Sequence, residues 1–470
     1  MSARTYRSEH TGGITNGAVS FWYDQIGVPE RGEELPGDRT ADVCIVGAGL
    51  TGLWTAYYLA KQQPDLRIVM LEKEFAGYGA SGRNGGWLSA ELAGNLDRYA
   101  ETGGRDGVLR LVRAMESAVD EVIGVCEAEG IHADIVKDGV LHVARSEPQL
   151  ARLDATLRAN AGWGIDESHE RRLSRGEVRD RVRVEGALGA VYSPHCARVQ
   201  PAKLVQGIAA AVRALGVTIY EGTEVTAIEP GRAITRNGVV RADHVLRCLE
   251  GYTASIEGRR REWLPMNSSM IATEPLPTAV WDEIGWTGAE LVGDAANAYS
   301  YAQRTVDGRI AIGGRGVPYR FGSRTDVDGV TQAQTIESLL AILHSQFPAT
   351  HGLPIAHAWC GVLGVPRDWC ASVAVDRDTG LGWAGGYVGS GLTTTNLAGR
   401  TLADLVLGQE SELVSLPWTG RQVRQWEPEP LRWLGVQAMY ALYREADRRE
   451  AAGLRKPSRI TRFANLLTGR

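Results

Sequence analysis

The chain has 470 residues, too many for one ordinary domain, so two domains with sizeable cores are expected. A formal net charge of −5 gives no reason to expect nucleic acid as a partner. Six scattered cysteines without a C-x-x-C pair argue against a disulfide framework and a zinc site, and no metal is expected. The first twenty residues lack a signal-type apolar core, and no apolar run approaches the roughly 18 residues that cross a bilayer. We therefore expect a cytoplasmic protein.

Residues 1–35 are polar and rich in glycine, apart from the aromatic cluster of Phe21, Trp22 and Tyr23. We expect this segment to be an N-terminal arm whose aromatic cluster packs onto the body of the protein rather than binding a ligand.

Residues 43–72 have the pattern of a βαβ unit: an apolar run, a helical stretch and a second apolar run closed by an acid. Gly47, Gly49 and Gly52 follow the spacing G-x-G-x-x-G, which permits a tight turn, a close approach of the backbone to phosphates, and helix–sheet packing. Glu72 lies twenty residues after Gly52, where a carboxylate can bind an adenosine ribose. The pattern predicts a dinucleotide site; a glycine-rich turn without a ligand is the alternative.

A second glycine-rich stretch, residues 77–94, follows at once and suggests that backbone approaches a planar ligand closely. Residues 97–183 are mainly helical by spacing, interrupted by a strand at 139–144. From residue 201 the sequence again predicts alternating helices and strands, with further strands over 265–320 and a helix over 331–347.

Residues 381–408 run from an apolar strand through Gly385, Gly386, Gly389 and Gly391 into a helix. This is a second strand-to-helix turn of the kind that places N–H groups and a helix dipole against a ligand. A nicotinamide cofactor needs one such turn, whereas FAD is long enough to use both.

Four motifs in this order resemble the FAD-dependent amine and amino-acid oxidoreductases of the D-amino-acid-oxidase type, and within them the γ-glutamylputrescine-oxidoreductase-like branch. They are GAGLTG…LE, GASGRNGG (79–86), RADHVLRCLEGYT (241–253) and GYVGSGLTTTNLAGR (386–400). The resemblance implies an α/β protein with a Rossmann-like FAD-binding domain and an α+β substrate domain of antiparallel sheet plus helices. The FAD domain would be discontinuous, from 36–95, 195–260 and 355–410; the substrate domain would comprise 96–194 and 261–354, and a helical tail 420–470.

The resemblance also implies roles for individual residues. The first glycine motif would hold the pyrophosphate, Glu72 the ribose and the backbone of Val225 the adenine, while the two later glycine stretches would contact the flavin. The cofactor-binding residues would be Gly47, Gly49, Leu50, Thr51, Gly52, Glu72, Lys73, Gly79, Ala80, Ser81, Gly82, Arg83, Asn84, Gly85, Gly86, Val225, Gly251, Gly389, Ser390, Gly391, Leu392, Thr393 and Thr394.

The reaction implied is hydride transfer from the carbon bearing an amine to flavin N5, giving an imine that water hydrolyses. Dioxygen or another acceptor would then reoxidise the flavin. Such chemistry is carried by the cofactor, and the sequence identifies no dedicated base.

Candidates for a substrate-facing wall are Tyr299, Tyr301 and Arg304, with Arg315 and Arg320 after them. Strand alternation places the two tyrosines on one face. An arginine there could bind a substrate carboxylate bidentately. Surface arginines on a hairpin are the alternative.

Two positions depart from sarcosine-oxidase relatives. Ala311 stands where those relatives have a lysine beside the flavin, and Cys360 is displaced by one position from their flavin-linking cysteine, which would turn it to the opposite strand face. We therefore expect noncovalent FAD.

Other interpretations stay open. Residues 291–298, LVGDAANA, mimic a segment of flavin monooxygenases, but Asp294 runs into a strand instead of a glycine-rich helix. A disulfide reductase would need a redox cysteine pair. A noncatalytic flavin-binding protein is not excluded. The tail fits either docking on the body, the commoner outcome, or peripheral contact with an anionic membrane.

Overall fold

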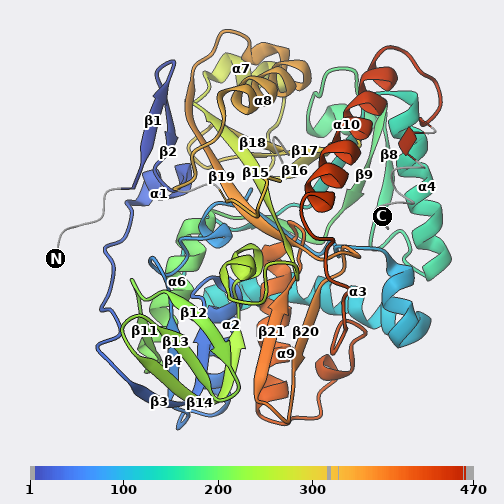
Figure 1. Ribbon diagram of the computed structural model, residues 1–470. Helices are drawn as coiled ribbons and strands as arrows, with labels where there is room; N and C mark the ends of the chain where they lie inside the picture. Colours follow the sequence, from blue (N-terminus) through green and yellow to red (C-terminus); the bar gives the residue numbers. More distant parts are fainter. Residues whose placement is uncertain (1–5, 315–318, 326–327, 459, 462–470) are drawn as a thin grey trace.

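The computed structural model describes residues 6–314, 319–325, 328–458 and 460–461, and two large sheets dominate them. In Figure 1 the nucleotide sheet lies in the lower half and a ten-stranded sheet in the upper half. Arg315, one of the substrate-facing candidates, lies outside the described residues.

The nucleotide sheet is built around the predicted βαβ unit. Its parallel strands are β11 (Thr218–Tyr220), β4 (Ile68–Leu71), β3 (Arg39–Val46), β14 (Val239–Arg247) and β21 (Leu381–Gly385), and its antiparallel additions are β12 (Val225–Glu229), β13 (Arg232–Thr235) and β20 (Ser372–Val375). Because the centre of the sheet is covered on both faces, β4 is apolar throughout and β3 is apolar from Val43 to Val46. The predicted parallel α/β unit is present.

Helices from distant parts of the chain form one core with this sheet. They are α2 (Leu50–Gln62), α3 (Leu96–Ala128), α6 (Pro201–Ala214) and α9 (Gly391–Val406). Gly399 of α9 lies so close to α2 that an added Cβ would lie 2.6 Å from the Cβ of Trp54. Both predicted glycine turns therefore begin helices that pack against each other.

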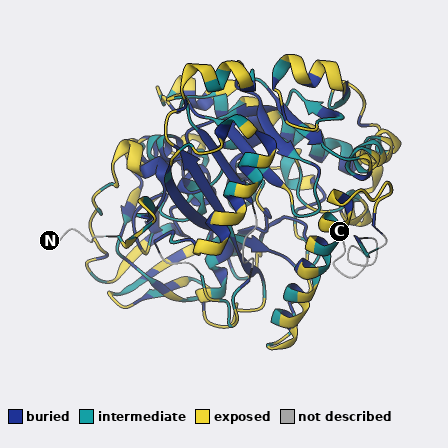
Figure 2. Ribbon diagram, turned by 90° about the horizontal axis from the view of Figure 1, so that it is seen from above, coloured by how far each residue is buried: buried dark blue, intermediate teal, exposed yellow. Residues whose placement is uncertain are grey.

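The ten-stranded sheet is mostly antiparallel. In order, its strands are β1 (Ser8–Thr11), β2 (Ile14–Gly17), β19 (Ile355–Val365), β15 (Leu264–Thr273), β18 (Ile310–Gly314), β17 (Ser300–Arg304), β16 (Leu291–Asp294), β7 (Val140–Ala144), β9 (Gly189–Ser193) and β8 (Arg171–Ser174). The covering helices are α4 (Glu147–Trp163), α5 (Arg175–Arg181), α7 (Thr278–Ile284) and α8 (Ala333–Gln346). Figure 2 shows exposed residues on the outer helices and buried residues along the strands between them.

A small third sheet joins β5 (Trp87–Ser89), β10 (Cys196–Arg198) and β6 (Val136–Lys137). Strand β5 follows directly after the loop GASGRNGG (79–86). This loop therefore connects the nucleotide sheet to the small third sheet.

The expected segment boundaries do not coincide with the sheets. Strand β19, which we expected to open the last FAD segment at residue 355, pairs with β15 in the ten-stranded sheet. Helix α3, expected in the substrate domain, packs in the nucleotide core. Both differences have the same cause. Strand β19 and helix α3 each have an apolar side that could pack against either large sheet, and their order in the sequence does not decide between the two.

Both ends of the chain pack onto the body. Phe21, Trp22 and Tyr23 on α1 (Phe21–Ile26) are buried, as predicted for the arm, and β2 extends the ten-stranded sheet. Helix α10 (Leu431–Ala451) buries Val436, Tyr440 and other residues on one side. No helix among the described residues is long and apolar enough to cross a membrane.

Candidate cofactor and substrate site

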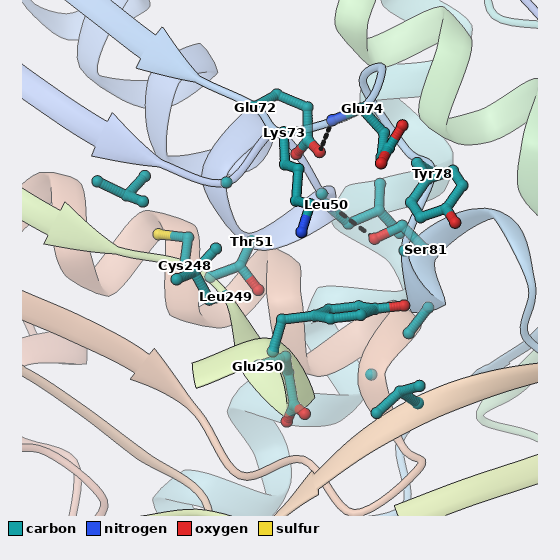
Figure 3. A pocket seen from close by; sticks show the side chains of 18 of the residues that line it. Leu50, Thr51, Glu72, Lys73, Glu74, Tyr78, Ser81, Cys248, Leu249 and Glu250 are labelled. Carbon is teal, nitrogen blue, oxygen red and sulfur yellow. Dashed lines mark hydrogen bonds between the residues drawn. The ribbon is translucent and has the colours of Figure 1, made fainter. Parts of the chain in front are cut away.

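A cavity of about 330 Å³ lies at the carboxyl ends of β3 and β4, between the two glycine-rich turns. Its size is within the range of small-molecule sites, and its position is where open α/β sheets bind ligands. Figure 3 shows side chains from α2, the segment 72–81 and the segment 248–250 around it.

Fourteen of the predicted cofactor residues line this cavity: Gly47, Gly49, Leu50, Thr51, Glu72, Lys73, Gly79, Ala80, Ser81, Asn84, Val225, Gly389, Gly391 and Leu392. Nine others do not line it: Gly52, Gly82, Arg83, Gly85, Gly86, Gly251, Ser390, Thr393 and Thr394. The glycines among the nine are close-packing positions. A Cβ on Gly52, for example, would lie 2.1 Å from the Gly47 carbonyl oxygen.

The first glycine turn, at residues 47–49, connects β3 to α2 in a tight bend beside the cavity. Gly47 has φ of 102°, which favours glycine, and its N–H donates to the Leu71 carbonyl at 2.8 Å. The Leu50 N–H, in the first turn of α2, donates to Ser81 Oγ at 2.8 Å. This bond fastens the loop GASGRNGG to the helix N-terminus beside the cavity (Figure 3).

Glu72 is held by backbone donors. Its carboxylate accepts the N–H groups of Ala48 and Glu74, both at 2.9 Å. Burial nevertheless raises the pKa of Glu72 to about 7. The side chain therefore borders the cavity with its carboxylate oriented by two backbone N–H groups, and its contact with an adenosine ribose stays a prediction.

Arg83 is a buried cation next to the cavity. Its Nε donates to the Tyr78 carbonyl at 2.7 Å, and its guanidinium lies 4.2 Å from the ring centroid of Tyr78, which lines the cavity. Its two terminal nitrogens have no hydrogen-bond partner among the described residues. Arg83 does not itself line the cavity, so it supports the cavity wall through Tyr78.

Glu250 is a site residue that the sequence interpretation missed. It lines the cavity at the start of the short 3-10 segment Glu250–Ser255, and burial raises its pKa to about 7. Its carboxylate accepts the N–H of Tyr387, at 2.8 Å, and the N–H of Gly364. The signal in the sequence was an acid directly before Gly251, just after the strand that ends at Arg247. Tyr78, Tyr252 and Tyr387 also line the cavity and were not predicted.

A second cavity of about 340 Å³ adjoins the later glycine turn. Its described lining is Ala93, Gly94, Asn95, Tyr299, Trp369, Val388 and Ser390. Val388 and Ser390 alternate along the turn with Gly389 and Gly391, which face the first cavity. The two cavities therefore share one wall.

The two tyrosines share one side of the strand, and their contact with substrate stays a prediction. The rings of Tyr299 and Tyr301 lie 6.3 Å apart, as strand alternation predicted, and Tyr299 borders the second cavity. The Tyr301 hydroxyl is 2.9 Å from Ser268 Oγ, and its ring lies against Gly85 of the loop GASGRNGG.

The prediction for Arg304 is wrong. Its guanidinium lies 4.4 Å from the ring centroid of Trp281 and donates to the Trp286 carbonyl. Side chains alternate between the two faces of a strand, and Arg304 is an odd number of residues from both tyrosines. The arginine therefore points to the face opposite the tyrosines. Arg320 lines neither cavity.

Residues 360 and 311, which depart from the sarcosine-oxidase relatives, are both buried. Cys360 Sγ is 3.6 Å from the Val330 carbonyl oxygen, while the neighbouring Gly361 faces the loop, since a Cβ there would lie 3.4 Å from that of Arg83. Ala311 is buried in an aromatic cluster with Trp359. Asp294 accepts Ser300 Oγ at 2.7 Å in a strand connection, unlike the monooxygenase segment.

A profile of the family described as FAD dependent oxidoreductase matches residues 42–405. The chain belongs to this FAD-dependent oxidoreductase family. It is 30% identical over 407 residues to the probable oxidoreductase OrdL of Rhizobium meliloti, covering 83% of this chain and 89% of that protein. It is 29% identical over 374 residues to γ-glutamylputrescine oxidoreductase of Escherichia coli, covering 78% and 84%.

Among solved structures, glycine oxidase from Geobacillus kaustophilus superposes with a TM-score of 0.68 at 22% identity, covering 82% of this chain and 99% of that one. This likeness shows a shared fold. FAD fits the residues that line the first cavity: two glycine turns for the ends of a long dinucleotide, and the oriented carboxylate of Glu72 beside the first turn.

Helix α10 lies beyond the residues matched by the family profile and fixes the loop that precedes Tyr299. Asp447 accepts the backbone and side-chain N–H groups of Asn297, at 2.9 and 2.7 Å, and the N–H of Ala298, at 3.0 Å. Arg152 donates to buried Glu450 at 3.0 Å and to the Ala295 carbonyl at 2.8 Å.

We predict that Asp447→Ala speeds amide hydrogen exchange in residues 295–298 by at least about tenfold, because each bond to a charged group contributes roughly 1.5–3 kcal/mol. Exchange measured by mass spectrometry checks this. Glu445→Ala is the matched control, since Glu445 lies on the same helix and pairs with exposed Arg448 and Arg449. Equal exchange in the two variants would contradict the role of Asp447.

Proposed function

We propose that this FAD-dependent oxidoreductase oxidises the C–N bond of a primary or secondary amine or an amino acid. A hydride would leave the carbon that bears the amine, giving an imine that water hydrolyses. The bound flavin supplies the hydride acceptor, and dioxygen or another acceptor restores it. The names of relatives support this class, since γ-glutamylputrescine oxidoreductase and a glycine oxidase of Bacillus licheniformis are among them.

The observation that carries the proposal is the wall shared by the two cavities. A substrate in the second cavity would be separated from a cofactor in the first only by the turn at residues 388–391. Hydride transfer requires direct contact, so the reacting carbon would have to pass this turn, where Gly389 and Gly391 carry no side chain that could block the approach.

The lining of the second cavity suits an uncharged amine. The described lining residues include no charged side chain, and Tyr299 and Trp369 present aromatic rings. Removing water from an ammonium group lowers its pKa and favours the neutral amine, the form that can release hydride. Tyr299 and Trp369 would therefore exclude water and orient the substrate.

Anaerobic addition of the true substrate should bleach the flavin absorbance, and a panel of primary amines, secondary amines and amino acids identifies it.

In Tyr299→Ala we expect kcat/KM for that substrate to fall by about tenfold or more, because an aromatic wall contributes roughly 1–3 kcal/mol. Tyr299→Phe, which keeps the ring, should retain most activity. Failure of every amine in a broad panel to reduce the flavin would refute the proposal and favour a noncatalytic flavoprotein.

We further propose that FAD is bound noncovalently, because Cys360 is turned toward Val330 and away from the loop GASGRNGG. Acid precipitation should release the yellow colour into the supernatant, where its absorbance is measured. Colour that stays in the washed protein pellet would indicate a covalent link.

A further inference from the structure

A compact group of potential metal ligands lies outside both cavities. Glu116 on α3, His169 in the turn before β8, and His195 in the turn between β9 and β10 each offer one ligand atom, and these atoms lie within 4.8 Å of one another. We propose that this trio, Glu116–His169–His195, binds one divalent transition-metal cation of the zinc class.

The side chains converge on a single point. His169 Nδ1 contacts Glu116 Oε1, and His195 Nε2 lies 3.6 Å from the same oxygen. Zinc bonds to nitrogen and oxygen of about 2.0–2.1 Å place tetrahedral ligand atoms about 3.3 Å apart. The trio is therefore near the spacing of a metal site, and small side-chain movements would complete it.

The backbone that carries the two histidines is fixed independently of the trio. Ser193 Oγ donates to the His169 carbonyl at 2.9 Å, and the His195 carbonyl accepts the Ala90 N–H at 3.0 Å. Such support reduces the entropic cost of assembling ligands from separate segments. One contact would be replaced on binding, that of His195 Nε2 with the Ser168 carbonyl oxygen at 3.3 Å.

The chemistry of the trio favours a borderline metal over a hard cation. Two imidazoles and one carboxylate are a common zinc ligand set, whereas Mg²⁺ prefers oxygen ligands alone. The three side chains are 15–24% exposed, so water can reach a fourth position. All six cysteines are buried, which removes exposed thiols as competing ligands.

A cation here would act as a cross-link. Glu116 belongs to a helix packed in the nucleotide core, His169 precedes a strand of the ten-stranded sheet, and His195 precedes the small sheet next to the loop GASGRNGG. Binding would therefore stabilise the folded chain by RT ln(1 + c/Kd), where c is the free Zn²⁺ concentration.

The test uses the tag-free, FAD-loaded full chain, treated with EDTA and dialysed, then titrated with ZnSO₄ in a calorimeter at pH 7.5. We expect one Zn²⁺ per chain and an increase in melting temperature with Zn²⁺ but not with Mg²⁺. His169→Ala, His195→Ala and Glu116→Gln should each weaken binding by at least about tenfold.

His351→Ala is the matched control, because His344 and His351 also bring two imidazole rings together, with centroids 4.3 Å apart, but belong to no three-ligand group among the described residues. Circular dichroism and flavin content verify that each variant is folded. The proposal is overturned if wild-type binding is weaker than about 1 mM, if it survives all three substitutions, or if it is lost in His351→Ala.

Discussion

The carboxylate of Glu250, half-buried at the edge of the first cavity, is the constraint on which the site depends. It follows strand β14 of the nucleotide sheet, yet it accepts an N–H from Gly364 in β19 of the ten-stranded sheet and another from Tyr387 at the second glycine turn. A carboxylate out of water must find donors, and backbone N–H groups of two other segments supply them here. One side chain thereby fixes where the two sheets and the turn meet.

The arrangement of the cavities follows from that junction. The turn held by Glu250 separates the cofactor cavity from the cavity bordered by Tyr299, while β19 presents Gly361 to the loop that contains Arg83. Helix α10 then fixes the loop before Tyr299 through Asp447. Elements that are hundreds of residues apart thus determine one shared wall.

The parts of the site that are local in sequence could be predicted. G-x-G-x-x-G, the terminal Glu72 and the second glycine turn are short patterns whose geometry is set by backbone chemistry, and the strand face of Tyr299, Tyr301 and Cys360 follows from a period of two. The same alternation places Arg304 on the opposite face of the strand from the tyrosines, so its charge alone is not evidence that it faces the same cavity.

Long-range features could not be predicted. Glu250 acquires its role from donors in β19 and at Tyr387, 114 and 137 residues later. The placement of β19 depends on pairing with β15, and both candidate sheets accept an apolar strand. The trio Glu116–His169–His195 has no short ligand spacing, since His169 is 53 residues from Glu116, so a motif search directed at cysteine pairs could not find it.

The most direct test of the central claim, that Glu250 holds together the segments that bind FAD, is the FAD dissociation constant of Glu250→Gln. Titration of apoprotein with FAD, followed by fluorescence quenching, should show affinity weakened by about tenfold or more, because the amide leaves a buried backbone N–H without an acceptor. Glu229→Gln, on the same sheet and paired with Arg232, does not line the cavity and should bind like wild type. Unchanged affinity in a folded Glu250→Gln variant would contradict the account.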